Sequence, residues 1–146
     1  ELDLVRRDLQ KWPELRGRVT ECAQSVVSEP RADSRGGFDA YLLLEVTGHY
    51  RDDDLALLLT YAAAGLSKSG RLIVVERLSD DGAITEDQAE FDLLMLCMHG
   101  SGVRTRAEFE SVATEAGLVV TASRLVGWGI AVLDLQPAPE AVVPQR

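Results

Sequence analysis

The chain is poor in cysteine, in aromatic residues and in basic residues. Its 146 residues include two cysteines and 5% aromatics, and the formal net charge is −9. This acidic balance excludes nucleic-acid phosphate and anionic lipid as main partners, because both would be repelled. No apolar run approaches the ~20 residues that span a bilayer. The first ten residues, ELDLVRRDLQ, lack the apolar core of a secretory signal. We therefore expect a cytoplasmic protein.

The two cysteines, Cys22 and Cys97, are far apart and lie on apolar segments. This arrangement favours buried free thiols in a reducing compartment over a disulfide. No group of metal-ligating residue types surrounds either cysteine in the sequence. We therefore expect no metal site.

What is present is typical of a folded domain, because 46% of the residues are hydrophobic and 27% are charged. We expect one α/β domain over residues 1–136. The remaining segment, PAPEAVVPQR at 137–146, is expected to be a flexible tail.

Two nearly continuous apolar runs are the strongest structural signal. FDAYLLLEV at 38–46 and RLIVVERL at 71–78 have the pattern of parallel strands covered on both faces, so both are expected at the centre of a sheet. Before them, the sequence predicts a helix near 3–12, a short strand at 18–23 and a loop at 28–37.

Helical periodicity fills the spaces between and after these strands. Leucines and alanines from Leu55 to Leu66 repeat at helical spacing behind three aspartates at 52–54, which suit the cap and the helix dipole. Ser69-Gly70 is expected to stop this helix. Two later helices are expected to open with capping boxes at Thr85 and Thr105. Strands at 118–126 and 128–136, joined at Gly127, are expected to form an antiparallel pair.

In open α/β sheets, ligands bind at the carboxyl ends of the strands. The loop Gly48-His49-Tyr50 follows one such end, and Glu76 lies near another. Position alone makes the loop a candidate active-site corner. The alternative is a connecting loop in which Tyr50 packs and His49 is solvated.

Several segments resemble a known family in order and spacing. They are LDL at 2–4, RV at 18–19, DAYLLLEV at 39–46, GRLIVVERL at 70–78, FDLLMLCMHGSGVRTRAEF at 91–109 and EAGLVV at 115–120. With these segments the chain resembles the C-terminal catalytic domain of S-adenosylmethionine-dependent small-molecule O-methyltransferases. The resemblance implies a partial Rossmann-like class I methyltransferase fold, a parallel sheet with an antiparallel C-terminal strand pair.

The sequence departs from this family at the positions that hold the cofactor. By this resemblance, the sequence is expected to begin after the family's glycine-rich first turn and to lack the N-terminal helical dimerisation domain. Asp3 matches the acidic residue that holds the cofactor ribose. However, Gln24-Ser25 replaces the family's Gly-Asp, and Leu44 replaces its lysine. We therefore expect that this chain requires no cofactor unless a partner or a missing segment completes the site.

The catalytic corner departs as well. The family's His-Asp-Trp becomes Gly48-His49-Tyr50, which removes the general base, and His49 takes that role only if the loop shifts by one residue. Val103 replaces the glutamate that orients the base, whereas Glu76 is kept. The resemblance makes His49 and Glu76 the catalytic candidates. The substrate-binding candidates are Tyr50, Met95, Met98 and His99.

Three functions remain open. The chain is a subunit of a split natural-product enzyme that catalyses a reaction other than methyl transfer, such as a ring closure, with a longer methyltransferase-like chain as its partner. Alternatively, it is a fragment of a true O-methyltransferase, or a non-catalytic scaffold for an active homologue. In the first two cases the expected ligand is a small molecule.

Overall fold

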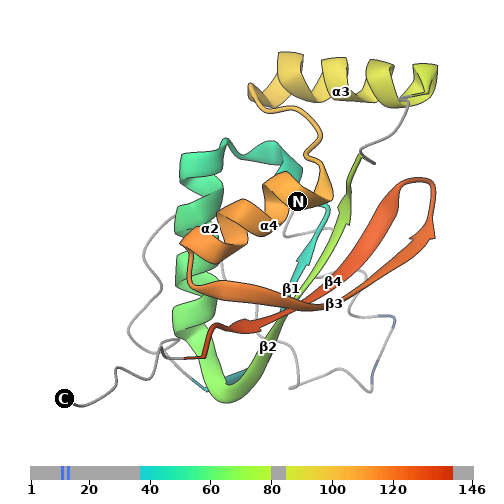
Figure 1. Ribbon diagram of the computed structural model, residues 1–146. Coiled ribbons are helices and arrows are strands. Elements are labelled where there is room, and N and C mark those ends of the chain that lie inside the picture. Colours follow the sequence, from blue (N-terminus) through green and yellow to red (C-terminus); the bar gives the residue numbers. More distant parts are fainter. Residues whose placement is uncertain (1–10, 12, 14–36, 80–84, 140–146) are drawn as a thin grey trace.

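The computed structural model describes residues 11, 13, 37–79 and 85–139 (Figure 1). The helix, the strand and nearly all of the loop predicted before residue 37 lie outside these residues. So do Asp3, Cys22, Gln24 and Ser25.

Four strands form one sheet in the order β1-β2-β4-β3. Their bounds are β1 (Phe38–Leu44), β2 (Leu66–Arg77), β3 (Leu118–Gly127) and β4 (Ile130–Pro137). β1 and β2 are parallel, whereas β4 runs antiparallel to both β2 and β3. This arrangement confirms the predicted fold class. β2 lies inside the sheet as expected, whereas β1 is at the end of the described strand order.

Two helices cover one face of this sheet. α2 (Asp52–Gly65) packs against β2, α4 (Arg106–Glu115) packs against β3, and the two helices contact each other. In Figure 1 they lie together beside the sheet. Their buried residues meet those of the strands in one core, which includes Leu55, Leu59, Phe109, Val112, Leu72, Val74, Leu133 and Leu135.

The third helix stands apart from this layer. α3 (Glu86–His99) lies beyond the carboxyl end of β2 in Figure 1, and it contacts the short helix η3 (Thr47–His49). α3 begins with a capping box between Thr85 and Gln88, and α4 begins with the same motif between Thr105 and Glu108. Both boxes confirm the prediction from the sequence.

The boundary between α2 and β2 differs from the prediction. The helix ends at Gly65, and the strand begins at Leu66, so Ser69-Gly70 lies within β2. A Cβ atom on Gly70 would lie 2.6 Å from the carbonyl oxygen of Phe38. Gly70 therefore permits a close approach between two strands and does not stop the helix. At the other end of the helix, Arg51 is the N-cap, and the three aspartates occupy the first turn.

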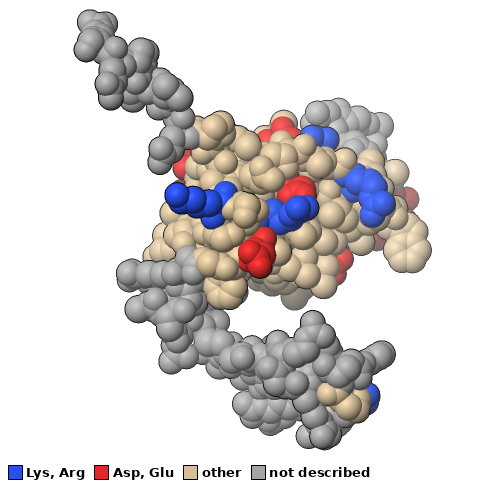
Figure 2. Space-filling model, turned by 90° about the horizontal axis from the view of Figure 1, so that it is seen from below, with Lys and Arg blue, Asp and Glu red and all other residues tan. Residues whose placement is uncertain are grey.

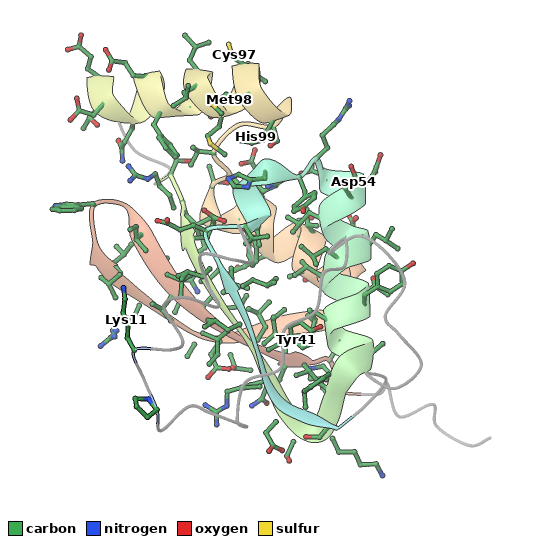
Figure 3. All side chains as sticks on the ribbon, turned by 180° about the vertical axis from the view of Figure 1, so that it is seen from behind. Lys11, Tyr41, Asp54, Cys97, Met98 and His99 are labelled. Atoms are coloured by element: carbon green, nitrogen blue, oxygen red, sulfur yellow. The ribbon has the colours of Figure 1, made fainter. Side chains whose placement is uncertain are left out.

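The prediction that Cys97 is buried is wrong. The thiol is free and exposed, and Figure 3 shows it on the outer side of α3. The second half of α3, residues 93–98, is apolar on nearly all sides, but only Met95 is buried among the residues of this helix. The exposed apolar residues of this helix are Leu93, Leu94, Leu96 and Met98.

The face of the sheet opposite α2 is also apolar. Side chains alternate between the two faces of a strand. In β2, Leu72 and Val74 are buried, whereas Ile73 and Val75 on the other face are half-buried. On the neighbouring strand β1, Leu42 is 60% exposed and Leu44 is 58% exposed. Among the described residues, no helix covers this second face as α2 and α4 cover the first.

The charged residues form a mixed surface. On the face drawn in Figure 2, basic and acidic side chains are interspersed between uncharged ones. No helix within the described residues is long and apolar enough to cross a membrane.

Candidate functional site

Three segments converge at the carboxyl ends of β1 and β2. They are η3, the last residues of β2, and the loop at 100–105 between α3 and α4. The loop attaches to the extension of β2, because the backbone N–H of Ser79 donates to the carbonyl of Arg104 at 2.9 Å. Ser101 Oγ donates to the carbonyl of Gly48 at 2.6 Å, which ties the loop to η3. The fold thus brings together the corner that the sequence singled out.

Glu76 is the central polar residue of this site, and it is only 8% exposed. Its Oε2 accepts hydrogen bonds from Thr47 Oγ1 at 2.7 Å and from the backbone N–H of Gly48 at 3.0 Å. Its Oε1 accepts from the backbone N–H of Arg77 at 2.9 Å. A carboxylate offers about four acceptor positions, so most of this capacity is already used. Glu76 therefore anchors η3 to β2.

A small cavity of about 10 Å³ opens beside Glu76. Gly48 forms part of its wall, and a Cβ atom there would lie 3.4 Å from Met95 Cε and 3.7 Å from Glu76 Oε1. Phe91, Phe109 and Val103 also line the cavity. Most of its wall is therefore apolar, and the position of the family's base carries no side chain.

Arg104 is a functional-site residue that the sequence reading missed. Its side chain is only 9% exposed. Its Nε donates to Asp52 Oδ1 at 2.9 Å, and its terminal nitrogens donate to the carbonyls of Thr47, at 3.1 Å, and Tyr50. Arg104 also lines an open hollow of about 440 Å³ next to the Glu76 cavity, together with Arg51, Asp53 and Gly102. An arginine within a glycine-rich loop between two helices is only a weak sequence signal for such a position.

The two histidines of the described chain lie against each other. The rings of His49 and His99 are stacked, with centroids 4.3 Å apart and planes inclined by 18°. Figure 3 shows His99 at the end of α3 near η3. His49 is exposed and lines neither the Glu76 cavity nor the adjoining hollow. Tyr50 is half-buried and packs against the hydrophobic core, as the connecting-loop alternative states.

The two methionines that were predicted to bind substrate lie in different environments. Met95 lines the Glu76 cavity and is 9% exposed. Met98 is 65% exposed and lines neither the Glu76 cavity nor the adjoining hollow. Residues three apart lie only about 60° apart around a helix, so helical geometry alone does not separate the two methionines. On the same helix, Asp92 accepts a hydrogen bond from the backbone N–H of Val103 at 2.6 Å and so holds the loop.

The described residues offer little to a cofactor. At the end of β1, where the family has a lysine, Leu44 is an exposed aliphatic side chain without hydrogen-bonding groups. The other matched positions lie outside the described residues. This part of the chain therefore does not by itself fit S-adenosylmethionine, and we derive no step through it. Within the described ranges, no group of three histidine, cysteine or acidic residues is arranged to hold a metal ion.

Comparison with known proteins identifies the family. A model of the O-methyltransferase domain matches residues 18–119, which include the whole Glu76 site. The chain belongs to this family. The match confirms the resemblance that the sequence motifs indicated.

Two curated relatives come from natural-product pathways of Streptomyces. The mitomycin biosynthesis 6-O-methyltransferase of Streptomyces lavendulae is 31% identical over 93 residues, which are 64% of this chain and 26% of that protein. The aclacinomycin 10-hydroxylase RdmB of Streptomyces purpurascens is 31% identical over 113 residues, 73% of this chain and 30% of the relative. The family thus includes a member named for hydroxylation rather than for methyl transfer.

A solved structure supports the same fold. The mitomycin 7-O-methyltransferase MmcR superposes with a TM-score of 0.79 at 24% identity, covering 90% of this chain and 38% of that one. The chain therefore spans well under half the length of these relatives.

Proposed function

We propose that this chain is one part of a small-molecule enzyme of natural-product biosynthesis that a second, longer methyltransferase-like polypeptide completes, and that it does not itself transfer a methyl group. The proposed reaction is one that depends on positioning, such as an intramolecular displacement or ring closure. The proposed compartment is the cytoplasm.

The observation that carries this proposal is that hydrogen bonds within the protein occupy the Glu76 carboxylate. The one carboxylate in the cavity holds Thr47, Gly48 and Arg77 by three hydrogen bonds. A general base must lie within hydrogen-bond reach of the proton that it removes. Gly48 has no side chain, and His49 stacks on His99 outside the cavity. A site of this kind offers a substrate no free base.

The hollow next to the Glu76 cavity has the volume of a small-molecule site. Pockets for small molecules usually measure about 300–1,000 Å³, and the hollow measures about 440 Å³, whereas the Glu76 cavity holds only about 10 Å³. Arg51, Asp53 and Ser101 are among the residues that line the hollow. Both sites share Gly102, Val103 and Arg104. A ligand in the hollow would therefore contact the residues that border the Glu76 cavity.

Exposed apolar surface supports the proposal that a second polypeptide binds this chain. Leu93 is 60% exposed and Leu96 is 53% exposed on α3, and Leu42 and Leu44 are exposed on the uncovered face of the sheet. Each Å² of apolar surface left in water forgoes about 25 cal/mol. The matched relatives are much longer than this chain. A polypeptide that supplies the remaining length would cover these surfaces.

A second candidate function is O-methyl transfer from S-adenosylmethionine to a small-molecule hydroxyl. The 31% identity to the mitomycin biosynthesis 6-O-methyltransferase favours it. In this case the remainder of the enzyme would supply both the cofactor site and the base. The third candidate, a non-catalytic scaffold, needs no intact cavity.

The experiment that tests these candidates isolates the tagged chain from its own cells and measures the complex by native mass spectrometry. We expect a stoichiometric complex with a longer chain. The complex is then incubated with extract metabolites and S-adenosylmethionine that carries a deuterated methyl group. We expect a product without deuterium, and its formation should fall in Met95→Phe, which fills the cavity, but not in Met98→Phe on the exposed side of α3. A deuterated product would favour O-methyl transfer, and equal activity of both variants would favour the scaffold.

A further inference from the structure

A second cavity, of about 50 Å³, lies beside the end of β2. We call it the Trp128 pocket, and it is lined by Arg77, Gln88, Asp92, Val103, Trp128 and Gly129. Successive side chains of a strand point to opposite faces, so Arg77 turns away from the core that Glu76 borders.

Trp128 forms the outer wall of the Trp128 pocket, and its conformation is unusual. The residue is 89% exposed, and its backbone φ is +52°. A bulky side chain in the left-handed region is strained by about 1 kcal/mol or more. The flanking Gly127 and Gly129 also have positive φ. Glycine or asparagine at position 128 would fit this turn with less backbone strain than tryptophan. An exposed indole contributes little to the hydrophobic core, so a strained tryptophan at this position is better explained by ligand binding than by a role in folding.

Arg77 supplies the charge of the Trp128 pocket. Its guanidinium carbon lies 4.3 Å from the centroid of the Phe91 ring, which fixes the orientation of the group. The ion pairs of the described residues involve the other arginines, Arg71, Arg104 and Arg106. Within that part of the chain, Arg77 is therefore a half-buried cation without a carboxylate partner.

The remaining polar groups of the pocket are partly committed. Gln88 Oε1 accepts from Thr85 in the capping box, which leaves the amide NH₂ group to donate. Asp92 Oδ1 accepts from Val103, which holds that oxygen against the loop. The free donors are thus a guanidinium and an amide, and they lie in one cavity with an exposed aromatic ring.

We propose that the Trp128 pocket binds a small planar aromatic carboxylate, whose ring stacks on the Trp128 indole and whose carboxylate pairs with the Arg77 guanidinium. A guanidinium fork matches a carboxylate in two parallel hydrogen bonds, and offset stacking suits a flat ring. Together with an open hollow of about 460 Å³ that shares Arg77, Gln88, Trp128 and Gly129, the pocket admits one or two fused rings. The Trp128 pocket shares Arg77, Leu78 and Val103 with the wall of the Glu76 cavity, but the binding proposed here requires neither Glu76 nor the proposed reaction.

The test titrates the chain with 2-naphthoate and with its neutral isostere 2-naphthamide, followed by calorimetry. We expect the carboxylate to bind about tenfold more tightly than the amide, because only the carboxylate forms the charged pair. Arg77→Gln should remove this difference. Arg71→Gln is the matched control, because Arg71 lies on the same strand but pairs with Asp134, and it should leave the difference unchanged.

A second variant examines the stacking surface without endangering the fold. Trp128→Gly removes an exposed side chain at a position with positive φ, so the variant should be at least as stable as the parent chain. We expect it to lose at least about tenfold in affinity for both ligands. Equal affinities for carboxylate and amide, no measurable naphthoate binding, or full binding in Trp128→Gly would each overturn the proposal. Binding that vanishes only in Met95→Phe would assign the ligand to the Glu76 cavity instead.

Discussion

At the scale of single residues, the site is held together by polar side chains that link segments far apart in the sequence. Glu76 binds the loop after β1, and Arg104 binds the same loop from the other side. Arginine is exposed in most proteins, and no local pattern indicates which arginine will be buried. The sequence therefore pointed to Glu76 through its place at a strand end, but gave no reason to select Arg104.

Arg104 should contribute strongly to stability. We expect Arg104→Met to lower the free energy of unfolding by about 2–4 kcal/mol, because the carbonyls of Thr47 and Tyr50 would lose their partner. Asp52 is mostly exposed, so the ion pair itself contributes little of this. Urea denaturation measures the change. Arg106→Met is the control, because its pair with Glu110 lies on the surface of α4, and it should change stability by less than about 0.5 kcal/mol. Similar effects of the two variants would contradict this account.

Gly102 should be less tolerant of substitution than Gly48. A Cβ atom on Gly102 would lie 2.5 Å from Asp92 Oδ1, the oxygen that binds the backbone N–H of Val103. We expect Gly102→Ala to displace Asp92 and to lower the free energy of unfolding by about 1–2 kcal/mol, the value of that hydrogen bond. On Gly48 the new methyl group would meet the flexible end of Met95 at 3.4 Å and Glu76 Oε1 at 3.7 Å, which are ordinary contact distances. Thermal unfolding of both alanine variants compares them, and a larger loss in Gly48→Ala would be evidence against the geometry.

At the scale of elements, the sequence predicted what depends on local pattern and missed what depends on packing between elements. Apolar runs located β1 and β2, and the two capping boxes located the starts of α3 and α4. The end of α2 was misplaced, because Gly70 serves the contact with β1 rather than the helix end. The exposure of Cys97 was missed for a related reason. An apolar helix sequence does not say how many of its sides are covered.

The two capping boxes should have different global effects, although they are chemically alike. Removal of an N-cap hydroxyl typically costs about 1 kcal/mol. α4 contributes Phe109 and Val112 to the core, whereas α3 buries only Met95. We expect Thr105→Ala to lower global stability by this amount, and Thr105→Ser to restore most of it. Thr85→Ala should instead raise hydrogen exchange within residues 86–99 alone, because α3 can open locally. Faster exchange throughout the sheet in Thr85→Ala would be inconsistent with this division.

At the scale of the whole molecule, the described residues form part of an open sheet with one covered face, plus a helix that packs on one side. The chain belongs to the O-methyltransferase family and spans only part of the length of its relatives. The sequence motifs predicted the family, whereas the exposed apolar surfaces became apparent only once the strands and α3 were placed.

Charges on α3 should separate partner binding from folding. Leu93→Glu combined with Leu96→Glu replaces two exposed side chains, so we expect the circular dichroism spectrum and the unfolding midpoint of the chain to change little. In native mass spectrometry, the same variant should lose the proposed longer chain. Glu86→Lys with Glu90→Lys, at exposed polar positions of the same helix, is the control for charge changes in general. A double glutamate variant that retains its partner would place the interface elsewhere.

The central claim is that this chain supplies an acceptor pocket but neither the methyl donor site nor the base. Titration of the isolated chain with S-adenosylmethionine in a calorimeter tests it most directly. Circular dichroism establishes that the chain is folded under the conditions of the titration. Leu44 and the engaged Glu76 offer the cofactor no free polar group in the described site. We expect no binding at cofactor concentrations up to about 1 mM, equivalent to a binding free energy weaker than about −4 kcal/mol. A dissociation constant in the low micromolar range would contradict the claim.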